Sequence, residues 1–181
     1  MRVAIVGSSH VRRMDHVNEF IPGTTLTRYF WKSGGKVEDI YRFIADLQTF
    51  RPNLIFLQIG GNDIDINTCP ERLAHDIYTL CQRLLSSVEG LERVYVGSLF
   101  LRLRTRGVPF DHYDQMRRRV NECLGRQSCS CIVYWRHQRI VPACLDDDQV
   151  HLNVRGNKQL YMSMRGALKG FITFGFNHNP H

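Results

Sequence analysis

Three side chains that lie far apart in this sequence could together make a serine hydroxyl reactive. A serine hydroxyl is a weak nucleophile by itself and needs a neighbouring imidazole to accept its proton. Ser9 supplies a hydroxyl near the start of the chain, and His151 supplies an imidazole near its end. An imidazole in turn needs a carboxylate to fix its tautomer, and Asp148 lies three residues before His151. The order Ser9, Asp148, His151 therefore predicts a nucleophile, an orienting acid and a general base.

The sequence also contains donors for the oxyanion that forms when a hydroxyl attacks an ester. Preorganised donors stabilise such an oxyanion by about 3 kcal/mol each. The candidates are the backbone N–H of Ser9, the backbone N–H of Gly35 and the side-chain amide of Asn62. Gly34 could take the role of Gly35, because neither glycine has a Cβ that would block a close approach.

Each of these residues also has an ordinary structural explanation. Serine is favoured as the cap of a helix, and Asn62 with Asp63 after two glycines is typical of a turn. Asp146, Asp147 and Asp148 beside His151 could instead hold Mg²⁺, although we expect no metal. The dinucleotide, Walker and G-x-S-x-G motifs are missing, which argues against nucleotide binding and an α/β-hydrolase elbow. The presence of every required group in one chain favours catalysis.

Strand-like and helix-like segments alternate along the chain, which predicts one α/β sheet. The expected strands are residues 2–6, 26–31, 54–59, 93–100 and 131–135. Several of them are almost continuously apolar, as in a parallel sheet that helices cover on both faces. Apolar residues spaced by three and four predict the covering helices. Their core-facing stripes are Ile40, Phe43, Ile44 and Leu47; Leu73, Ile77, Leu80, Cys81 and Leu84; Phe110, Tyr113, Met116, Val120 and Leu124; and Leu160, Tyr161, Met164, Leu168 and Phe171.

This arrangement should bring the reactive groups to one edge of the sheet. Right-handed crossovers place the carboxyl ends of all parallel strands at the same edge. GSSHV (7–11), SGGK (33–36) and GGND (60–63) each follow an expected strand, and DDDQVHLN (146–153) precedes the last helix. We therefore expect these four segments to meet.

GSSHV, SGGKV, GGND and DDDQVHLN, in this order, resemble the four sequence blocks of the SGNH (GDSL-type) hydrolase superfamily. The resemblance implies a flavodoxin-like three-layer α/β/α sandwich with a central parallel five-stranded sheet. It implies Ser9 as nucleophile, Gly35 and Asn62 as oxyanion-hole residues, and Asp148 and His151 as acid and base. The opening also resembles SGNH esterase domains in the first open reading frame of some animal non-LTR retrotransposons. Ser8 stands where the family usually has aspartate.

Length and charge limit the other expectations. The chain has 181 residues, 43% of them hydrophobic, which predicts a single SGNH hydrolase-like domain over residues 1–181. The net charge is +7, and 20 of the 24 basic residues are arginine, so RNA, DNA, an anionic membrane or an acidic substrate could be a partner. The arginines at 117–119 and at 102, 104 and 106 are expected to be solvated surface rather than a binding patch.

Cysteine spacing and hydropathy indicate the compartment. The six cysteines lack the paired spacing of a zinc site, and free thiols favour a reducing environment. No apolar run approaches the ~18 residues of a membrane-spanning helix, and the N-terminus lacks the ~7-residue apolar core of a secretory signal. We expect an intracellular, cytoplasmic protein, unless a leader lies outside the given sequence.

Together these observations predict a serine esterase that hydrolyses acyl or acetyl esters through an acyl intermediate on Ser9, without a cofactor. The expected partner is an ester substrate, either a lipid or an acetylated compound. The alternative is an SGNH-like binding module that holds RNA or an anionic surface through its arginines. A carbohydrate O-acetylesterase would share the chemistry and differ only in its groove.

Overall fold

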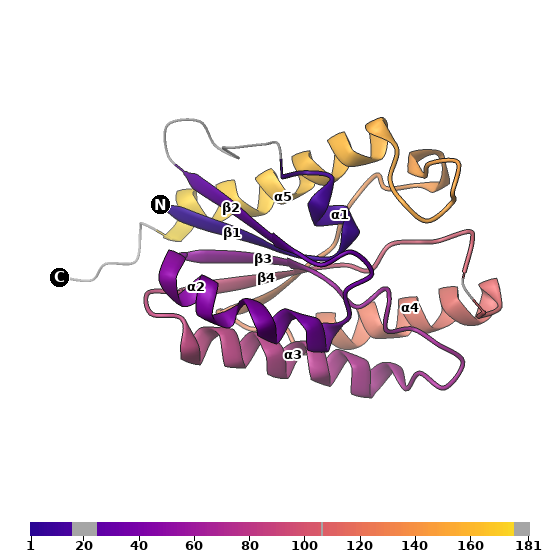
Figure 1. Ribbon diagram of the computed structural model, residues 1–181, viewed down its shortest axis with the longest axis horizontal. Helices are drawn as coiled ribbons and strands as arrows, with labels where there is room; N and C mark the ends of the chain where they lie inside the picture. The colour runs from indigo at the N-terminus through magenta and orange to yellow at the C-terminus, as the bar shows by residue number, and fades with distance from the viewer. Residues whose placement is uncertain (16–24, 106, 176–181) are drawn as a thin grey trace.

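The computed structural model describes residues 1–15, 25–105 and 107–175 of the chain (Figure 1). Its centre is a five-stranded sheet in the order β2-β1-β3-β4-β5, in which every neighbouring pair is parallel. The strands are β1 (Arg2–Gly7), β2 (Leu26–Trp31), β3 (Leu54–Gln58), β4 (Arg93–Gly97) and β5 (Ile132–Trp135). The expected α/β fold with a central, parallel, five-stranded sheet is confirmed.

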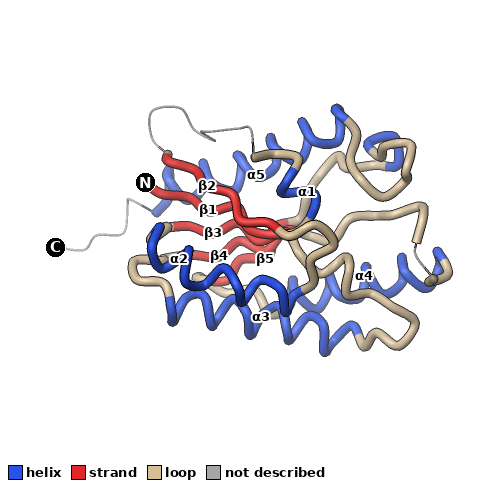
Figure 2. Tube along the Cα trace, in the orientation of Figure 1, coloured by secondary structure: helices blue, strands red, loops and turns tan. Residues whose placement is uncertain are grey.

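Helices cover both faces of this sheet and make three layers. One face carries α1 (Ser9–Arg12) and α5 (Val154–Gly175), and the other carries α2 (Ile44–Phe50), α3 (Pro70–Ser87) and α4 (Phe110–Arg126) (Figure 2). Two 3₁₀ segments complete the chain, η1 (Val37–Phe43) directly before α2 and η2 (Pro142–Cys144) before α5. Among the described residues, no helix is both long enough and apolar enough to cross a membrane.

Successive residues of the central strands contribute to two separate cores. In β1, Val3 and Ile5 pack with α1 and α5, whereas Ala4 and Val6 pack against α2, α3 and α4. All four side chains are fully buried. The middle of a strand that is covered on both faces has no solvent-exposed positions, which explains why the central strands are apolar between their end residues.

The strand order fixes where loops from different parts of the chain meet. β1 lies between β2 and β3, so the chain moves to one side of β1 first and to the other side afterwards. In open parallel sheets, the loops after such neighbouring strands diverge and leave a crevice at the carboxyl edge. Ser9 begins α1, with only Ser8 between it and the end of β1, and the loop after β3 carries Asn62.

Two expected details are wrong. β4 ends at Gly97 rather than at Phe100, because its neighbours β3 and β5 end at Gln58 and Trp135. The N–H of Ser98 still donates to the carbonyl of Trp135, but the N–H of Leu99 donates to the side chain of Asn121 instead of to a strand. Phe110, which was expected in the core stripe of α4, is 40% exposed because it is the first residue of that helix. The other four residues of that stripe are buried.

Candidate active site

Ser9 is the first residue of α1, directly after β1 and Ser8. The N–H of Ser8 donates to the carbonyl of Gln58 (3.3 Å), which holds this turn against the end of β3. Ser8 is the N-cap of α1, but its side chain makes no capping hydrogen bond. The capping position therefore belongs to Ser8, and the hydroxyl of Ser9 is free to bind another group.

Asp148 and His151 face each other across a tight turn that precedes α5. Asp148 Oδ1 accepts the backbone N–H groups of Val150 (2.9 Å) and His151 (2.8 Å). Gln149, the residue after Asp148, adopts a left-handed φ of 57°. The N–H of Asp146 donates to the carbonyl of His151 (2.8 Å). These bonds fix the backbone so that the carboxylate and the imidazole meet.

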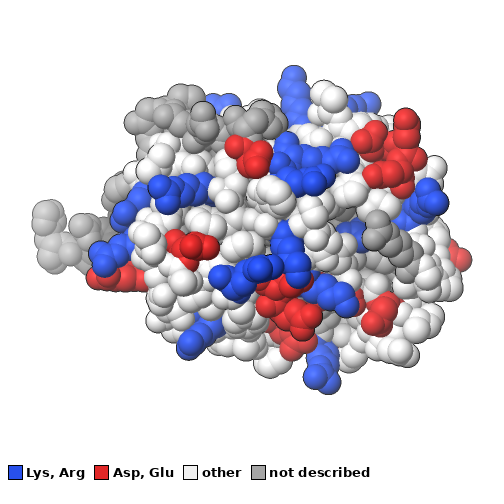
Figure 3. Space-filling model, viewed as in Figure 1, with Lys and Arg blue, Asp and Glu red and all other residues white. Residues whose placement is uncertain are grey.

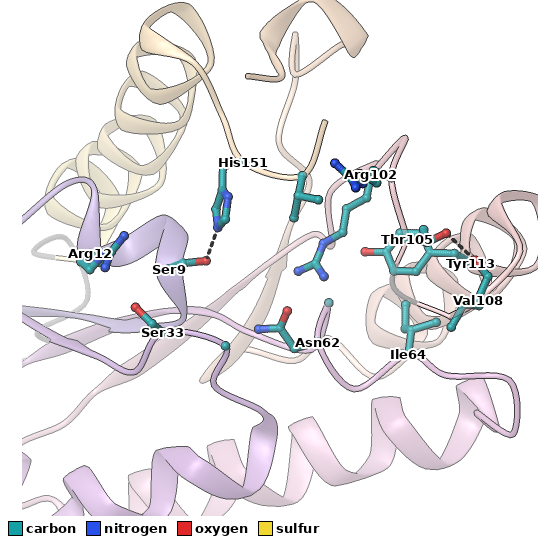
Figure 4. A pocket seen from close by; sticks show the side chains of 14 residues that line it. Ser9, Arg12, Ser33, Asn62, Ile64, Arg102, Thr105, Val108, Tyr113 and His151 are labelled. Carbon is teal, nitrogen blue, oxygen red and sulfur yellow. Dashed lines mark hydrogen bonds between the residues drawn. The ribbon is translucent and has the colours of Figure 1, made fainter. Parts of the chain in front are cut away.

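The three side chains predicted to act together form one hydrogen-bonded chain. Ser9 Oγ lies 3.0 Å from His151 Nε2 (Figure 4). His151 Nδ1 lies 2.5 Å from Asp148 Oδ2. Because a carboxylate can only accept a hydrogen bond, His151 carries its proton on Nδ1. Its Nε2 accepts a hydrogen bond from the Ser9 hydroxyl. Hydrogen bonds from the backbone N–H and the imidazole of His151 hold the pKa of Asp148 well below its usual range. Asp148 is therefore a carboxylate at neutral pH.

Arg13 connects α1 to the turn that carries Asp148 and His151. Its Nη1 donates to Asp146 Oδ2 (3.1 Å) and to the carbonyl of Leu152 (3.0 Å). The two acceptors lie before and after His151 in the sequence. Arg13 therefore holds the turn that carries His151 next to the end of α1. Arg13 was not among the residues expected at the site, because a basic residue after a short helix resembles any surface arginine.

The candidate oxyanion-hole residues differ in how they face the pocket. Asn62 lines the pocket, and its Nδ2 donates to the carbonyl of Gly35 (2.9 Å), which leaves the second N–H of the amide. Gly35 is buried and does not line the pocket, and its own N–H donates to the carbonyl of Lys32 (2.9 Å). Gly34 does line the pocket, with a left-handed φ of 68° that suits glycine. The backbone N–H that was expected from Gly35 is therefore already engaged in a turn.

Asp63, the residue after Asn62, anchors this loop to the second sequence block. Its two carboxylate oxygens lie 3.1 and 3.3 Å from the N–H of Val37, at the start of η1. Burial raises the pKa of Asp63 to about 6. From the sequence, Asp63 was expected only as part of a turn.

His10 follows Ser9 in α1 and is almost fully buried. Its ring centroid is 5.0 Å from that of Phe100 and 5.7 Å from that of His151. Burial lowers the pKa of His10 to about 3, and the charge of Arg102 acts in the same direction. The His10 ring is therefore neutral at physiological pH.

A pocket of about 520 Å³ opens in front of Ser9 and His151. Three arginines line it, Arg12, Arg102 and Arg104, and none of the described lining residues is acidic. Of the three arginines expected to be solvated surface in this region, Arg104 is exposed, Arg102 is half-buried inside the pocket, and Arg106 lies outside the described residues. The sequence around Arg102 does not indicate that this side chain is partly buried, because the residues that cover it come from other segments.

The other charged clusters of the sequence have partners within the protein. Arg117 and Arg118 pair with Asp114 (2.6 and 2.8 Å), and Arg119 pairs with Glu71 (3.0 Å). In Figure 3, basic and acidic side chains are interspersed over one face of the molecule. The arginine cluster at 117–119 is therefore not a free basic patch.

The aspartate run and the cysteines do not form a metal centre in the described part of the chain. Asp146 pairs with Arg13, and Asp148 pairs with His151. No group of three or more histidine, cysteine or acidic side chains among the described residues could hold a metal ion. All six cysteines are described and free, with the sulfurs of Cys129 and Cys131 3.6 Å apart.

Solved structures of low sequence identity share this fold. One is a member of the lipolytic protein G-D-S-L family from Veillonella parvula, with 19% identity over 95% of this chain and 98% of that chain (TM-score 0.70). Another is a carbohydrate esterase of family 3 from Talaromyces cellulolyticus, with 16% identity, 96% and 98% coverage and a TM-score of 0.68. A third is a psychrotrophic esterase from Pseudoalteromonas sp., with 11% identity, 95% and 98% coverage and a TM-score of 0.68.

No curated protein sequence matches the chain. The family described as GDSL-like Lipase/Acylhydrolase matches residues 1–164, a range that includes Ser9, Asn62, Asp148 and His151. The match therefore covers most of the chain and agrees with the resemblance noted in its four sequence blocks. The chain belongs to the GDSL-like lipase and acylhydrolase family.

Proposed function

We propose that this protein hydrolyses carboxylic esters through an acyl intermediate on Ser9. The observation that carries the proposal is the hydrogen-bonded chain from Asp148 through His151 to Ser9 at the wall of the pocket. As Ser9 Oγ attacks the carbonyl carbon of the ester, His151 Nε2 accepts the hydroxyl proton. Asp148 then stabilises the imidazolium that forms.

The oxyanion of the tetrahedral intermediate needs donors on the same side of the pocket. We assign this role to the N–H of Ser9, the N–H of Gly34 and the amide of Asn62. Gly34 replaces Gly35 in this assignment, because the Gly35 N–H already donates to Lys32. The N–H of Ser9 is suitable because the first N–H groups of a helix have no intrahelical acceptor.

In the remaining steps His151 gives up the proton that it accepted and then accepts and donates a second one. His151 donates its proton to the leaving alcohol when the tetrahedral intermediate collapses to the acyl-serine. A water molecule then attacks the acyl carbon, with His151 again accepting a proton, and the acid leaves as Ser9 regains its hydrogen. Every proton that moves in this scheme passes through His151.

Hydrolysis of 4-nitrophenyl acetate and labelling by a fluorophosphonate test the proposal. Ser9→Ala should lower kcat by at least about 10³-fold, because removal of a serine nucleophile disables the whole triad. The same variant should lose the fluorophosphonate label. Ser130→Ala, which removes an exposed hydroxyl remote from the pocket, is the matched control and should keep both signals.

Unimpaired turnover in Ser9→Ala would reject Ser9 as the nucleophile. A protein without ester turnover, but with RNA affinity that falls steeply with salt, would instead support the non-catalytic binding module. The ion pairs of the arginine cluster at 117–119 argue against that alternative.

A further inference from the structure

Arg102 is the residue of the pocket that ester hydrolysis by itself does not require. It lies in the segment between β4 and α4 and reaches across the pocket towards Asn62 (Figure 4). The backbone N–H groups of the next two residues, Leu103 and Arg104, both donate to the carbonyl of Gln149 (2.9 and 3.3 Å). Since Gln149 lies between Asp148 and His151, the segment that carries Arg102 is fixed to the acid and base turn.

Two other segments build a place for the Arg102 guanidinium. Its carbon lies 5.7 Å from the ring centroid of Tyr113, which is buried on α4. Gly61 also borders the guanidinium, because a Cβ there would sit 2.8 Å from Arg102 Nη2 and 3.4 Å from the Tyr113 hydroxyl. A glycine at position 61 therefore leaves the space that the guanidinium occupies.

The charge of Arg102 is not neutralised within the described part of the protein. Arg102 forms no ion pair there, and neither do Arg12 and Arg104. Arg13, by contrast, is paired with Asp146. No acidic residue among those described lines the pocket, and the nearby His10 ring is neutral. A half-buried guanidinium presents a planar set of N–H donors that fits a carboxylate or a phosphate.

We infer that the substrate is an ester that carries a carboxylate or phosphate group close to the scissile carbonyl, and that Arg102 binds this group. The inference rests on the proposed hydrolysis at Ser9. Arg12 and Arg104 line the same pocket and raise the local concentration of anions at its mouth. Arg102 is thus a specificity-determining residue that prefers charged esters over neutral ones.

Two matched pairs of esters test this preference and locate the charge. 3-Acetoxybenzoate and its methyl ester differ by a charge on the alcohol side of the scissile bond. Monomethyl glutarate and dimethyl glutarate differ by a charge on the acyl side. We expect the wild-type kcat/KM to favour the charged member of one pair by about tenfold or more, the effect of one charge-assisted hydrogen bond.

Three variants test whether that ratio of kcat/KM depends on the Arg102 guanidinium. Arg102→Gln should bring the ratio of charged to neutral kcat/KM close to one, and Arg102→Lys should keep part of the preference. Gly61→Ala keeps the charge but displaces the guanidinium, so the ratio should fall there as well. Arg83→Gln removes one charge from the exposed surface of α3 and should leave both activity and ratio unchanged.

Equal kcat/KM for both members of each pair in the wild type would overturn the inference. An equal loss on charged and neutral esters in Arg102→Gln would also overturn it, and would assign Arg102 to the oxyanion instead. Calorimetric binding of 3-hydroxybenzoate, compared with its methyl ester, does not require turnover. Binding that depends on Arg102, without any hydrolysis or fluorophosphonate label, would uphold the anion site and reject the proposed function. If neither Arg102-dependent binding nor hydrolysis or labelling is found, both the anion site and the proposed function are rejected.

Discussion

The position of His151 depends on a residue outside the reactive set. Arg13 binds Asp146 and the carbonyl of Leu152, so it holds the base turn against the helix that begins with Ser9. We expect Arg13→Gln to lower kcat for 4-nitrophenyl acetate by about tenfold or more, because misplacement of a base by about 1 Å can cost 10²-fold. KM should change little, because Arg13 does not line the pocket.

The same substitution should leave the stability of the protein nearly unchanged. The side chains of Arg13 and Asp146 are both partly exposed, and such an ion pair contributes about 1 kcal/mol or less. Arg13→Lys keeps the charge and should recover part of kcat, and Arg83→Gln is the control for net charge. A lower Tm together with an unchanged kcat would show that Arg13 is only structural.

At the scale of single residues, the sequence was informative where the chemistry restricts the residue type. A nucleophile, a base and an orienting acid can each be only one of a few residue types, so Ser9, His151 and Asp148 could be proposed from the sequence alone. The choice between Gly34 and Gly35 could not be made, because it depends on which N–H the turn to Lys32 uses. The role of Arg102 could not be recognised either, because Gly61 and Tyr113 create its position from other segments.

At the scale of elements, Asp63 joins the loop after β3 to η1 through the N–H of Val37. Burial raises its pKa to about 6, above the value near 3.8 of an unhindered aspartate. The folded state therefore binds this proton more tightly than the unfolded state. The resulting stabilisation is complete below about pH 3.8 and is lost as pH rises through about 6.

Asp63→Asn tests this coupling, because an amide oxygen can still accept from Val37 but does not ionise. The Tm of the variant minus that of the wild type should rise by about 3 °C or more between pH 4 and pH 7.5. Thermal unfolding followed by circular dichroism at both pH values measures it. A difference in Tm that is independent of pH would contradict the role of this carboxyl group.

The strands were predictable because both faces of the central sheet are covered, which leaves an uninterrupted apolar run. Their ends were less predictable. The run that begins at Arg93 remains buried from Val94 to Phe100, yet β4 stops at Gly97 because the neighbouring strands stop there. The length of a strand is thus set partly by its partners, and one segment of sequence does not contain that information.

At the scale of the whole molecule, two buried histidines control the response to acid. His10 is a buried residue of α1, and burial lowers the pKa of His10 and of His137 to about 3. His137 Nε2 lies 2.8 Å from Gln58 Oε1, and its Nδ1 lies 2.9 Å from Ser163 Oγ, so it joins the sheet to α5 as a neutral ring. Unfolding exposes both rings, which then take up protons below the ordinary histidine pKa of ~6.5.

The contribution of these two histidines to the free energy of unfolding should therefore be greatest above about pH 6.5 and should fall towards pH 4. Each histidine contributes a slope of about 1.4 kcal/mol per pH unit in this range. Chemical denaturation at several pH values gives the slope, which should be smaller in His137→Gln than in the wild type. His75→Gln, which removes an exposed imidazole on α3, is the control. An undiminished slope in His137→Gln would contradict this account.

The pocket wall that carries Arg102 is attached to the acid and base turn through two backbone N–H groups and one backbone carbonyl. Such backbone hydrogen bonds do not depend on the side chains of the segment. No residue of the segment belongs to the hydrogen-bonded chain of Ser9, His151 and Asp148. Grafting a different sequence between Leu101 and Pro109 should accordingly redirect the enzyme to other molecules while its reaction machinery stays intact. This segment is the natural starting point for diversifying the protein by design.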